Sequence, residues 1–284
     1  MRVVDGQAMS DLFHRKWTLV TGASSGIGEV FARRLAERKS NLILTARSAD
    51  KLHALARTVE AEHGIDTRVV PVDLGAQDGA TRLAIAVAAL DLPVEHLVNN
   101  AGVGAVGLVV DAEAARHADM VRLNCEALVV LTRHLLPAMI ARRSGGVIQV
   151  ASTASFQPVP YMATYAATKA FVHSYTVALA EELRSSGVRM MALCPGPVPT
   201  GFQEAAGIPQ LAGPMARIAM TADETVLAAL RAYEDERTVC VPGSINRLTA
   251  LSAKLLPRWL ITRAAGEAMR RSGRALPAKG GTSR

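Results

Sequence analysis

The glycine-rich run Thr-Gly-Ala-Ser-Ser-Gly-Ile-Gly at residues 21–28 constrains the fold of this chain more than any other segment. It follows a short apolar run at residues 17–20 and precedes an amphipathic stretch at residues 29–39. This order predicts a strand, a tight turn and a helix. Glycines let a backbone turn sharply and approach a pyrophosphate, which the N-terminus of the following helix attracts. The run therefore predicts a dinucleotide-binding turn with the spacing G-x-x-x-G-x-G.

Short apolar runs alternate with longer helical stretches along the rest of the chain. The predicted strands are residues 17–21, 41–46, 67–73, 96–100, 147–152, 188–194 and 238–242. The predicted helices include residues 50–62, 77–90, 111–143 and 161–186. Such alternation indicates a parallel sheet covered by helices on both faces. We therefore expect an α/β fold with a doubly wound parallel sheet of about seven strands, a Rossmann fold.

The composition excludes several other classes of protein. No apolar run reaches the length of about 20 residues that spans a bilayer, and residues 1–16 lack the apolar stretch of a signal peptide. The three cysteines, Cys125, Cys194 and Cys240, have no paired spacing and indicate free thiols in a reducing compartment. Neither the cysteines nor the seven histidines show a metal-ligand pattern. We therefore expect a cytoplasmic protein without a metal site.

The net charge of +7 is unevenly placed along the chain. Residues 245–284 contain nine cations and one anion, a charge of +8 that leaves −1 for residues 1–244. The body of the protein is therefore near neutral, and we expect no nucleic-acid partner. We divide the chain into a Rossmann-fold domain at residues 1–244 and a basic helical extension at residues 245–284, with a disordered end after Ser272.

The extension carries apolar residues at helical spacing, interrupted once by Pro257: Leu248, Leu251, Leu255, Leu256, Trp259 and Leu260. Cations border them at Arg247, Lys254, Arg258 and Arg263. One interpretation is that the apolar face packs on the body of the protein or on a partner subunit. The other is a helix that lies on an anionic membrane surface, peripheral to the bilayer.

Tyr165 and Lys169 share one face of a predicted helix, one turn apart, and Ser152 stands thirteen residues before the tyrosine. An unperturbed tyrosine has a pKa of about 10, and a fixed cation nearby favours the phenolate and lowers that pKa. A serine hydroxyl can hydrogen-bond to the oxygen that the tyrosine addresses. These three side chains suit proton transfer to or from a carbonyl or alcohol oxygen. A tyrosine and a lysine at this spacing also occur on solvated helix faces.

Further motifs resolve that ambiguity. Asn-Asn-Ala-Gly at residues 99–102 and Pro195-Gly196 occur in order with the glycine run, Ser152 and the Tyr-x-x-x-Lys pair. Over residues 16–202 the chain resembles the short-chain dehydrogenase/reductase family. The resemblance implies a homodimer or homotetramer that transfers hydride reversibly between a nicotinamide cofactor and a small-molecule ketone, aldehyde or secondary alcohol. Residues 1–244 would then be the catalytic domain.

The resemblance also implies roles for four residues. Tyr165 would protonate the carbonyl oxygen, and Ser152 would orient and polarise it. Lys169 would lower the pKa of the tyrosine and hold the nicotinamide ribose. Asn124, within a predicted helix, would hold a water molecule in a proton relay to the lysine.

Arg47 follows the second predicted strand, where the adenosine ribose lies in such folds. An acid there would repel a 2′-phosphate, but none occurs before Asp50, and a guanidinium binds phosphate through two hydrogen bonds. We therefore expect NADP(H) rather than NAD(H); the alternative is a solvated arginine at a helix start. The resemblance implies cofactor contacts from Gly22, Ser24, Ser25, Gly26, Ile27, Gly28, Arg47, Asp73, Leu74, Asn100, Ala101, Gly102, Tyr165, Lys169, Pro195, Gly196, Val198 and Thr200.

Two alternative functions stand beside this one. The segment from Gly22 to Gly26 also spells G-x-S-x-G, the nucleophile turn of serine hydrolases, with Ser24 as nucleophile and His134 or His173 as base. That alternative leaves Tyr165 and Lys169 without a role. The second alternative is a non-catalytic NADP-binding redox sensor, which bound cofactor without turnover would favour.

The substrate is expected to lie under a loop at residues 198–220. Apolar side chains at Val103, Val106, Phe156, Val159 and Phe202 favour an apolar ketone or acyl-type carbonyl reduced with NADPH, unless these residues belong to the core. Tyr161 has no lysine four residues later, so we expect it to form a pocket wall and not to act as the acid.

Overall fold

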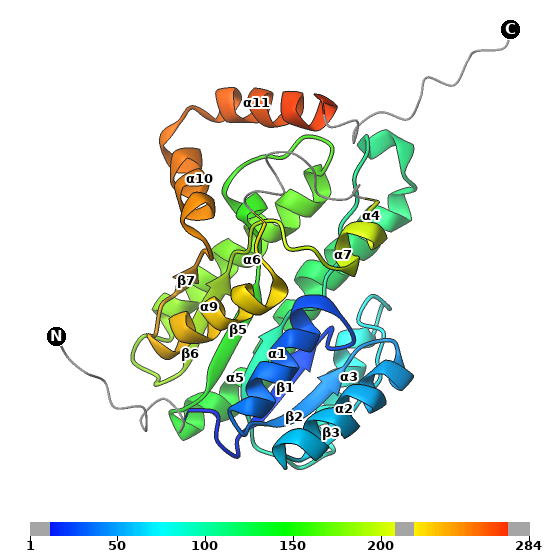
Figure 1. Ribbon diagram of the computed structural model, residues 1–284, viewed down its shortest axis with the longest axis vertical. Coiled ribbons are helices and arrows are strands. Elements are labelled where there is room, and N and C mark those ends of the chain that lie inside the picture. The colour runs from blue at the N-terminus through cyan, green and yellow to red at the C-terminus, as the bar shows by residue number, and fades with distance from the viewer. Residues whose placement is uncertain (1–11, 208–218, 272–284) are drawn as a thin grey trace, which may run out of the picture.

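Strand β1 (Trp17–Thr21) lies in the interior of the sheet, and all five of its residues are buried because helices cover both of its faces. The computed structural model describes residues 12–207 and 219–271. The other strands are β2 (Asn41–Thr45), β3 (Thr67–Val69), β4 (Val94–Asn99), β5 (Gly146–Val150), β6 (Arg189–Leu193) and β7 (Val239–Cys240). They form one parallel sheet in the order β3-β2-β1-β4-β5-β6-β7. The predicted seven-stranded α/β fold is confirmed (Figure 1).

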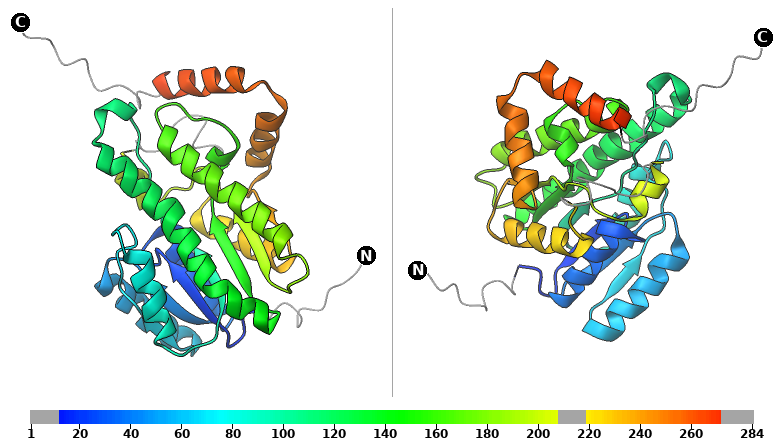
Figure 2. Two further views of the ribbon diagram at one scale, coloured as in Figure 1. Left: turned by 180° about the vertical axis from the view of Figure 1, so that it is seen from behind. Right: turned by 45° about the horizontal axis from the view of Figure 1, so that its top comes forward.

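Helices connect the strands and form two layers (Figures 1 and 2). The α-helices are α1 (Gly26–Glu37), α2 (Ala49–His63), α3 (Gly79–Ala88), α4 (Ala114–Val121), α5 (Ala127–Arg142), α6 (Ala163–Glu182), α7 (Gly201–Ala205), α9 (Ala222–Glu234), α10 (Ser244–Leu255) and α11 (Arg258–Arg271). Shorter turns are the 3-10 helices η1 (Val109–Asp111) and η3 (Thr153–Phe156) and the π-helical turn η2 (Arg122–Glu126).

The two layers follow from the alternation of side chains along each strand. In β1, Val20 packs with the apolar faces of α1, α2 and α9, whereas Leu19 packs with those of α3, α5 and α6. Each layer therefore has its own apolar core. The helices that connect the strands lie on the two faces of the sheet, as a parallel topology requires.

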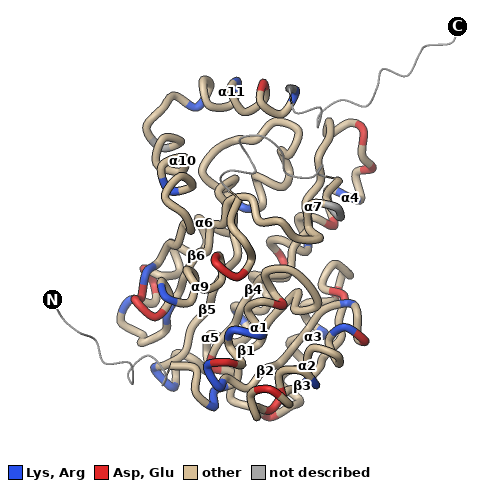
Figure 3. Tube along the Cα trace, in the orientation of Figure 1, with Lys and Arg blue, Asp and Glu red and all other residues tan. Residues whose placement is uncertain are grey.

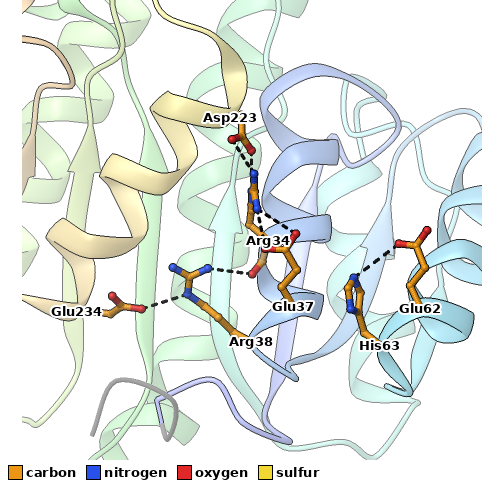
Figure 4. A network of polar contacts seen from close by, with 7 residues as sticks. All are labelled: Arg34, Glu37, Arg38, Glu62, His63, Asp223 and Glu234. Atoms are coloured by element: carbon orange, nitrogen blue, oxygen red, sulfur yellow. Dashed lines mark hydrogen bonds and ion pairs between the residues drawn. The ribbon is translucent and has the colours of Figure 1, made fainter. Parts of the chain in front are cut away.

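Two ion pairs join α1 to α9 within the first layer (Figure 4). Arg34 binds the Asp223 carboxylate through two hydrogen bonds of 2.6 and 2.7 Å, and this contact lowers the pKa of Asp223. Arg38 pairs with Glu234 at 3.2 Å. Because α1 begins within the glycine-rich run, at Gly26, these contacts fix the direction in which the N-terminus of α1 points.

One helix among the described residues, Ala114–Arg142, is long and apolar enough to cross a membrane by length and composition. It comprises α4, η2 and α5. Leu131, Leu135 and Met139 of its second half are buried in the core between the sheet and α3. The second half of this helix therefore packs on the sheet as part of the apolar core.

Two strands are shorter than predicted by three residues or more. The strand predicted at residues 67–73 ends at Val69, and Pro71, which has no N–H to donate to the ladder, follows two residues later. The strand predicted at residues 238–242 pairs only at Val239 and Cys240, at the edge of the sheet before Pro242.

The predicted break in the C-terminal extension is confirmed, since α10 ends at Leu255 and α11 begins directly after Pro257. The apolar residues named for this segment do not pack on the body of the protein, as one interpretation expected. Leu248, Leu251, Leu255, Leu256, Trp259 and Leu260 are all exposed. The other side of α10 faces the body instead, where Asn246 and Ala250 are buried. The predicted disorder after Ser272 lies outside the described residues.

Candidate active site

A cavity of about 800 Å³ opens at the carboxyl ends of the strands. The sheet order reverses between β1 and β4, which makes this edge the place where doubly wound folds bind ligands. Side chains that follow β1, β2, β4, β5 and β6 line the cavity, and α10 and α11 contribute Thr249, Ala250, Ala253 and Met269. The wall of the cavity therefore takes residues from the predicted Rossmann-fold domain (residues 1–244) and from the predicted C-terminal extension (residues 245–284).

The glycine-rich turn forms one wall of this cavity. Gly22 and Gly26 have φ values of +66° and +59°, which residues other than glycine rarely adopt. Gly28 is buried behind them, and a Cβ there would collide with the Gly22 carbonyl and the Asn100 side chain. The backbone of the turn and the N-terminus of α1 are therefore exposed to a ligand without intervening side chains, as an anion-binding turn requires.

Hydrogen bonds join the turn to the end of β4. The Thr21 hydroxyl oxygen accepts from the backbone amides of Asn100 (2.9 Å) and Ala101 (3.0 Å). The Asn100 side chain donates to the Thr21 carbonyl at 3.0 Å. Asn99 points the other way and donates to Thr132 in the core at 3.2 Å. Asn100 and Ala101 thus border the cavity, whereas Asn99 braces the helix behind the sheet.

Two cations line the end of the cavity next to β2. Arg47 lies two residues before α2 and Lys51 lies in the first turn of that helix, and both side chains are exposed. Asp73 and Leu74 line the same cavity after β3. This end of the cavity therefore has two cations, Arg47 and Lys51, and one carboxylate, Asp73. Lys51 is a basic residue that the sequence analysis missed.

Ser152 and Tyr165 meet at the opposite end, where β5 and α6 come together. The Tyr165 ring is buried and packs against Phe202, with the ring centroids 5.6 Å apart. Burial raises the pKa of Tyr165 to about 12, and a hydrogen bond from Ser152 acts in the opposite direction. The Ser152 oxygen also accepts from the Ala154 amide at 3.1 Å, which orients the hydroxyl at the start of η3.

Lys169 lies one turn after Tyr165 on α6, buried beneath it. Its Nζ donates to the Val150 carbonyl at 2.7 Å and lies 5.8 Å from the centroid of the Tyr165 ring. Burial lowers the pKa of Lys169 to about 8, against smaller opposing effects of Cys125 and Cys194. The predicted lowering of the tyrosine pKa by Lys169 is not seen, because the desolvation of the buried phenol dominates.

Asn124 lies in the π-helical turn η2 and is buried next to Lys169, although it does not line the cavity. Its Oδ1 accepts from the Val103 amide at 2.9 Å, and its Nδ2 donates to the Val103 carbonyl (2.9 Å) and to Thr168 (3.0 Å). A Cβ on Gly102 would lie 3.1 Å from Asn124 Oδ1 and 3.5 Å from Lys169 Nζ. The amide oxygen and the ammonium therefore border the same point.

The segment after β6 closes the cavity beside the glycine-rich turn. The Gln203 side chain accepts from the Thr200 amide at 2.7 Å and donates to the Val198 carbonyl at 2.5 Å, so it holds both residues in place. The Thr200 side chain lies against Gly26, 3.3 Å from where a Cβ would be. Gly196 leaves room for the buried side chain of Asn246, which anchors α10 to this segment.

The structure brings eighteen of the twenty sequence-predicted site residues to one cavity: Gly22, Ser24, Ser25, Gly26, Ile27, Arg47, Asp73, Leu74, Asn100, Ala101, Gly102, Ser152, Tyr165, Lys169, Pro195, Gly196, Val198 and Thr200. The other two, Gly28 and Asn124, lie directly behind its wall. Sequence reasoning missed Lys51, Gln203 and the residues of α10 and α11. A lysine at i+4 from Arg47 was a readable signal, whereas α10 and α11 gave none.

The expectations for the residues of the substrate pocket are met in part. Val103, Val159 and Phe202 line the cavity, whereas Val106 and Tyr161 border a smaller one of about 20 Å³ next to it. Phe156 packs on the His173 ring, with centroids 4.9 Å apart. The predicted covering loop at residues 198–220 lies partly outside the described residues.

The serine hydrolase alternative lacks its base. Ser24 lines the cavity, but none of the described residues around that cavity is a histidine. His134 is exposed on α5, and His173 packs on Phe156. In the described part of the chain no group of three or more His, Cys, Asp or Glu side chains has the arrangement of a metal site.

Comparison with known proteins identifies the family of this chain. Residues 16–209 match the short chain dehydrogenase family. The chain is 36% identical over 188 residues to the oxidoreductase YmfI of Bacillus subtilis, covering 66% of this chain and 76% of that protein. It is 34% identical over 196 residues to a very-long-chain 3-oxoacyl-CoA reductase of Phaeosphaeria nodorum, covering 67% of this chain and 58% of that reductase. The chain thus spans little more than half the length of that reductase.

Two solved structures are similar over most of the chain. One is a short-chain dehydrogenase from Sphingobium yanoikuyae in complex with NADPH, with a TM-score of 0.76 and 29% identity, covering 95% of this chain and 99% of that one. The other is a short-chain dehydrogenase/reductase from Burkholderia phymatum in complex with NAD, with a TM-score of 0.75 and 27% identity, covering 84% and 93%. The chain therefore belongs to the short-chain dehydrogenase/reductase family of oxidoreductases.

Proposed function

We propose that the protein is an NADPH-dependent reductase of an apolar ketone or 3-oxoacyl-type carbonyl. The observation that carries this proposal is the sharing of one cavity by two groups of residues. The glycine-rich turn with Arg47 and Lys51 lines one end, and Ser152, Tyr165 and Lys169 line the other. An elongated cofactor in this cavity would place its anionic groups at the first end and its reactive ring near Tyr165.

The residues present fit a nicotinamide dinucleotide. The turn offers an open backbone at the N-terminus of α1, where a side chain on Gly22 or Gly28 would collide with its neighbours. Arg47 and Lys51 suit a 2′-phosphate, because both are cations and no carboxylate precedes Asp50 after β2. This pair favours NADP(H) over NAD(H). A bound nicotinamide cofactor supplies the hydride, and the protein supplies position and the proton.

Tyr165 donates the proton to the carbonyl oxygen in the reductive direction. Its raised pKa of about 12 keeps the phenol protonated at neutral pH, which is the form that an acid needs. Ser152 holds the carbonyl oxygen against the phenol through its own hydroxyl, since the two side chains already interact.

Lys169 and Asn124 restore the proton. The Lys169 ammonium, with a pKa of about 8, is protonated at neutral pH and lies beneath the tyrosine. Asn124 Oδ1 keeps one lone pair beyond its bond to Val103, and this lone pair can hold a water molecule next to Lys169. Asn124 is thus a positioning residue for the relay.

An apolar substrate is supported by the walls of the cavity near Tyr165. Val103, Val159, Phe202 and Met269 line the cavity with aliphatic, aromatic or thioether side chains, and Phe202 packs on the Tyr165 ring. The similarity to very-long-chain 3-oxoacyl-CoA reductases points to the same chemical class.

The experiment is NADPH oxidation with a panel of small ketones, 3-oxoacyl thioesters, steroids and aromatic aldehydes. We expect turnover with long apolar ketones or 3-oxoacyl thioesters and a faster rate with NADPH than with NADH. Cofactor binding without turnover on any member would overturn the proposal and favour the redox sensor. A faster rate with NADH would overturn the role of Arg47 and Lys51.

A further inference from the structure

Helix α10 has two faces with different surroundings. Asn246 and Ala250 on one face are 3% and 7% exposed, and Ala253 on the same face lines the cavity. The opposite face carries apolar side chains that remain exposed, and further exposed apolar side chains follow at the start of α11. We name these residues the C-terminal apolar patch: Ile245, Leu248, Leu251, Leu255, Leu256, Trp259 and Leu260.

The exposure of this patch is large for apolar side chains. Leu255 is 75% exposed and Trp259 68% exposed. Scattered exposed leucines are ordinary on protein surfaces, but seven exposed apolar residues on two consecutive helices, a tryptophan among them, indicate an interaction site. Figure 1 shows α10 and α11 projecting from the end of the molecule opposite α2 and α3, where an extended surface can approach them.

Basic residues surround the patch. Arg247 on α10 and Arg258 and Arg263 on α11 are exposed, and the ion pair found in these helices within the described residues joins Arg270 to Glu267 at 2.6 Å. Figure 3 shows basic residues recurring along α10 and α11, with acidic residues confined to one position on α11. The surroundings of the patch are therefore strongly positive.

We propose that the C-terminal apolar patch docks the protein onto a membrane surface rich in anionic phospholipid. Leucine and tryptophan side chains enter the boundary between headgroups and acyl chains, and basic residues at their border bind lipid phosphates. A second copy of this chain fits the patch less well. A two-fold symmetric interface through the patch would bring the bordering cations Arg247, Arg258 and Arg263 of both copies into one interface, and like charges across an interface weaken association.

The patch and the cavity share the same two helices. Thr249 and Ala253 of α10 and Met269 of α11 line the cavity. Two contacts hold α11 in place beside the cavity. Arg270 donates a hydrogen bond to Tyr161, and Gly266 packs closely on Pro160. Docking through the patch therefore places one wall of the cavity next to the lipid surface. The docking itself does not depend on the proposed reductase activity.

The test is co-sedimentation of the full-length protein with vesicles. Mixed phosphatidylglycerol–phosphatidylcholine vesicles are compared with pure phosphatidylcholine vesicles at about 0.01 M and about 1 M salt, where the Debye lengths are about 30 and 3 Å. We expect binding to the mixed vesicles at low salt, weaker binding at high salt and little binding to phosphatidylcholine alone.

Matched variants separate the two components of the patch. The double variant Leu255→Gln with Trp259→Ala should abolish sedimentation, whereas Ile85→Gln, an equally exposed apolar site on α3, should leave it unchanged. Arg258→Glu should lower the partition coefficient at low salt at least fivefold, because one basic residue near an anionic surface contributes about 1 kcal/mol. Arg57→Glu, an exposed arginine on α2, serves as its control.

Three results would overturn the proposal. The first is full-length protein that stays in the supernatant with mixed vesicles at low salt. The second is unchanged sedimentation of the Leu255→Gln, Trp259→Ala variant. The third is an oligomeric parent protein that does not bind vesicles and that this variant converts into monomers. That result would assign the patch to a subunit interface. Circular dichroism and NADPH binding of each variant confirm that it is folded.

Discussion

Lys169 Nζ lies 5.8 Å from the centroid of the Tyr165 ring and donates a 2.7 Å hydrogen bond to the Val150 carbonyl. Burial drives the pKa values of the two groups in opposite directions, that of Tyr165 up to about 12 and that of Lys169 down to about 8. Both groups are therefore protonated at neutral pH. As the pH rises, the ammonium loses its proton first.

This order predicts the pH dependence of reduction. We expect kcat/KM to be constant below about pH 8 and to fall as the pH rises through the pKa of Lys169, because the neutral amine no longer supplies a proton to the relay. The profile of kcat/KM against pH reports ionisations of the free enzyme and checks this directly. A profile that stays flat well above pH 8 would show that Lys169 ionisation does not limit reduction.

Arg47 is predicted to set the preference for NADPH. Arg47→Asp removes one charge-assisted contact with the 2′-phosphate, which contributes about 1.5–3 kcal/mol, and introduces repulsion. We expect KM for NADPH to rise at least about tenfold and the preference over NADH to shrink accordingly. The control is Arg57→Asp, on the helix α2 that follows Arg47, which should leave both KM values unchanged. An unchanged NADPH/NADH ratio in Arg47→Asp would remove this role.

His96 is predicted to make stability depend on pH. It is buried on β4, bonded to Tyr233 Oη (3.0 Å) and the Leu12 carbonyl (2.9 Å), and burial lowers its pKa to about 4. The folded protein therefore holds this ring neutral while the unfolded chain protonates it at about pH 6.5. The stability linked to His96 is present above pH 6.5 and is lost as the pH falls to about 4, on the order of 3 kcal/mol.

Denaturant unfolding at several pH values measures that loss. His96→Gln should be less stable at neutral pH but should lose less stability between pH 6.5 and pH 4. The exposed His53→Gln variant on α2 should keep the slope of the parent protein. If His96→Gln kept the full slope, the dependence would belong to other groups.

Much of the fold and site could be predicted because it depends on local patterns. The apolar runs and the glycine-rich turn identify the strands and their order of connection, and the carboxyl ends of parallel strands meet at one edge. Asn100 and Ser152, at the ends of predicted strands, therefore belong at that edge. The Tyr165–Lys169 spacing was enough to place both on one face of α6.

What the sequence could not show depends on tertiary packing. The pKa of Tyr165 moves up and not down because the ring is buried against Phe202, and burial is not visible in a spacing pattern. The π-helical turn that carries Asn124 looks like ordinary helix in the sequence. One interpretation of the sequence placed the leucines of α10 against the body of the protein. In the structure the smaller residues Asn246 and Ala250 face the body instead.

The most direct test is the rate of NADPH oxidation by Tyr165→Phe and Tyr161→Phe, with the carbonyl substrate that the parent protein turns over fastest. Phenylalanine keeps the packing of the Tyr165 ring on Phe202 and removes only the hydroxyl. We predict that Tyr165→Phe binds NADPH like the parent protein in a fluorescence titration but lowers kcat at least about a hundredfold, the scale of lost acid catalysis. Tyr161→Phe, which lies outside the main cavity, should keep most of the activity. Parental kcat in Tyr165→Phe, or loss of activity in Tyr161→Phe instead, would contradict the assignment of Tyr165 as the proton donor.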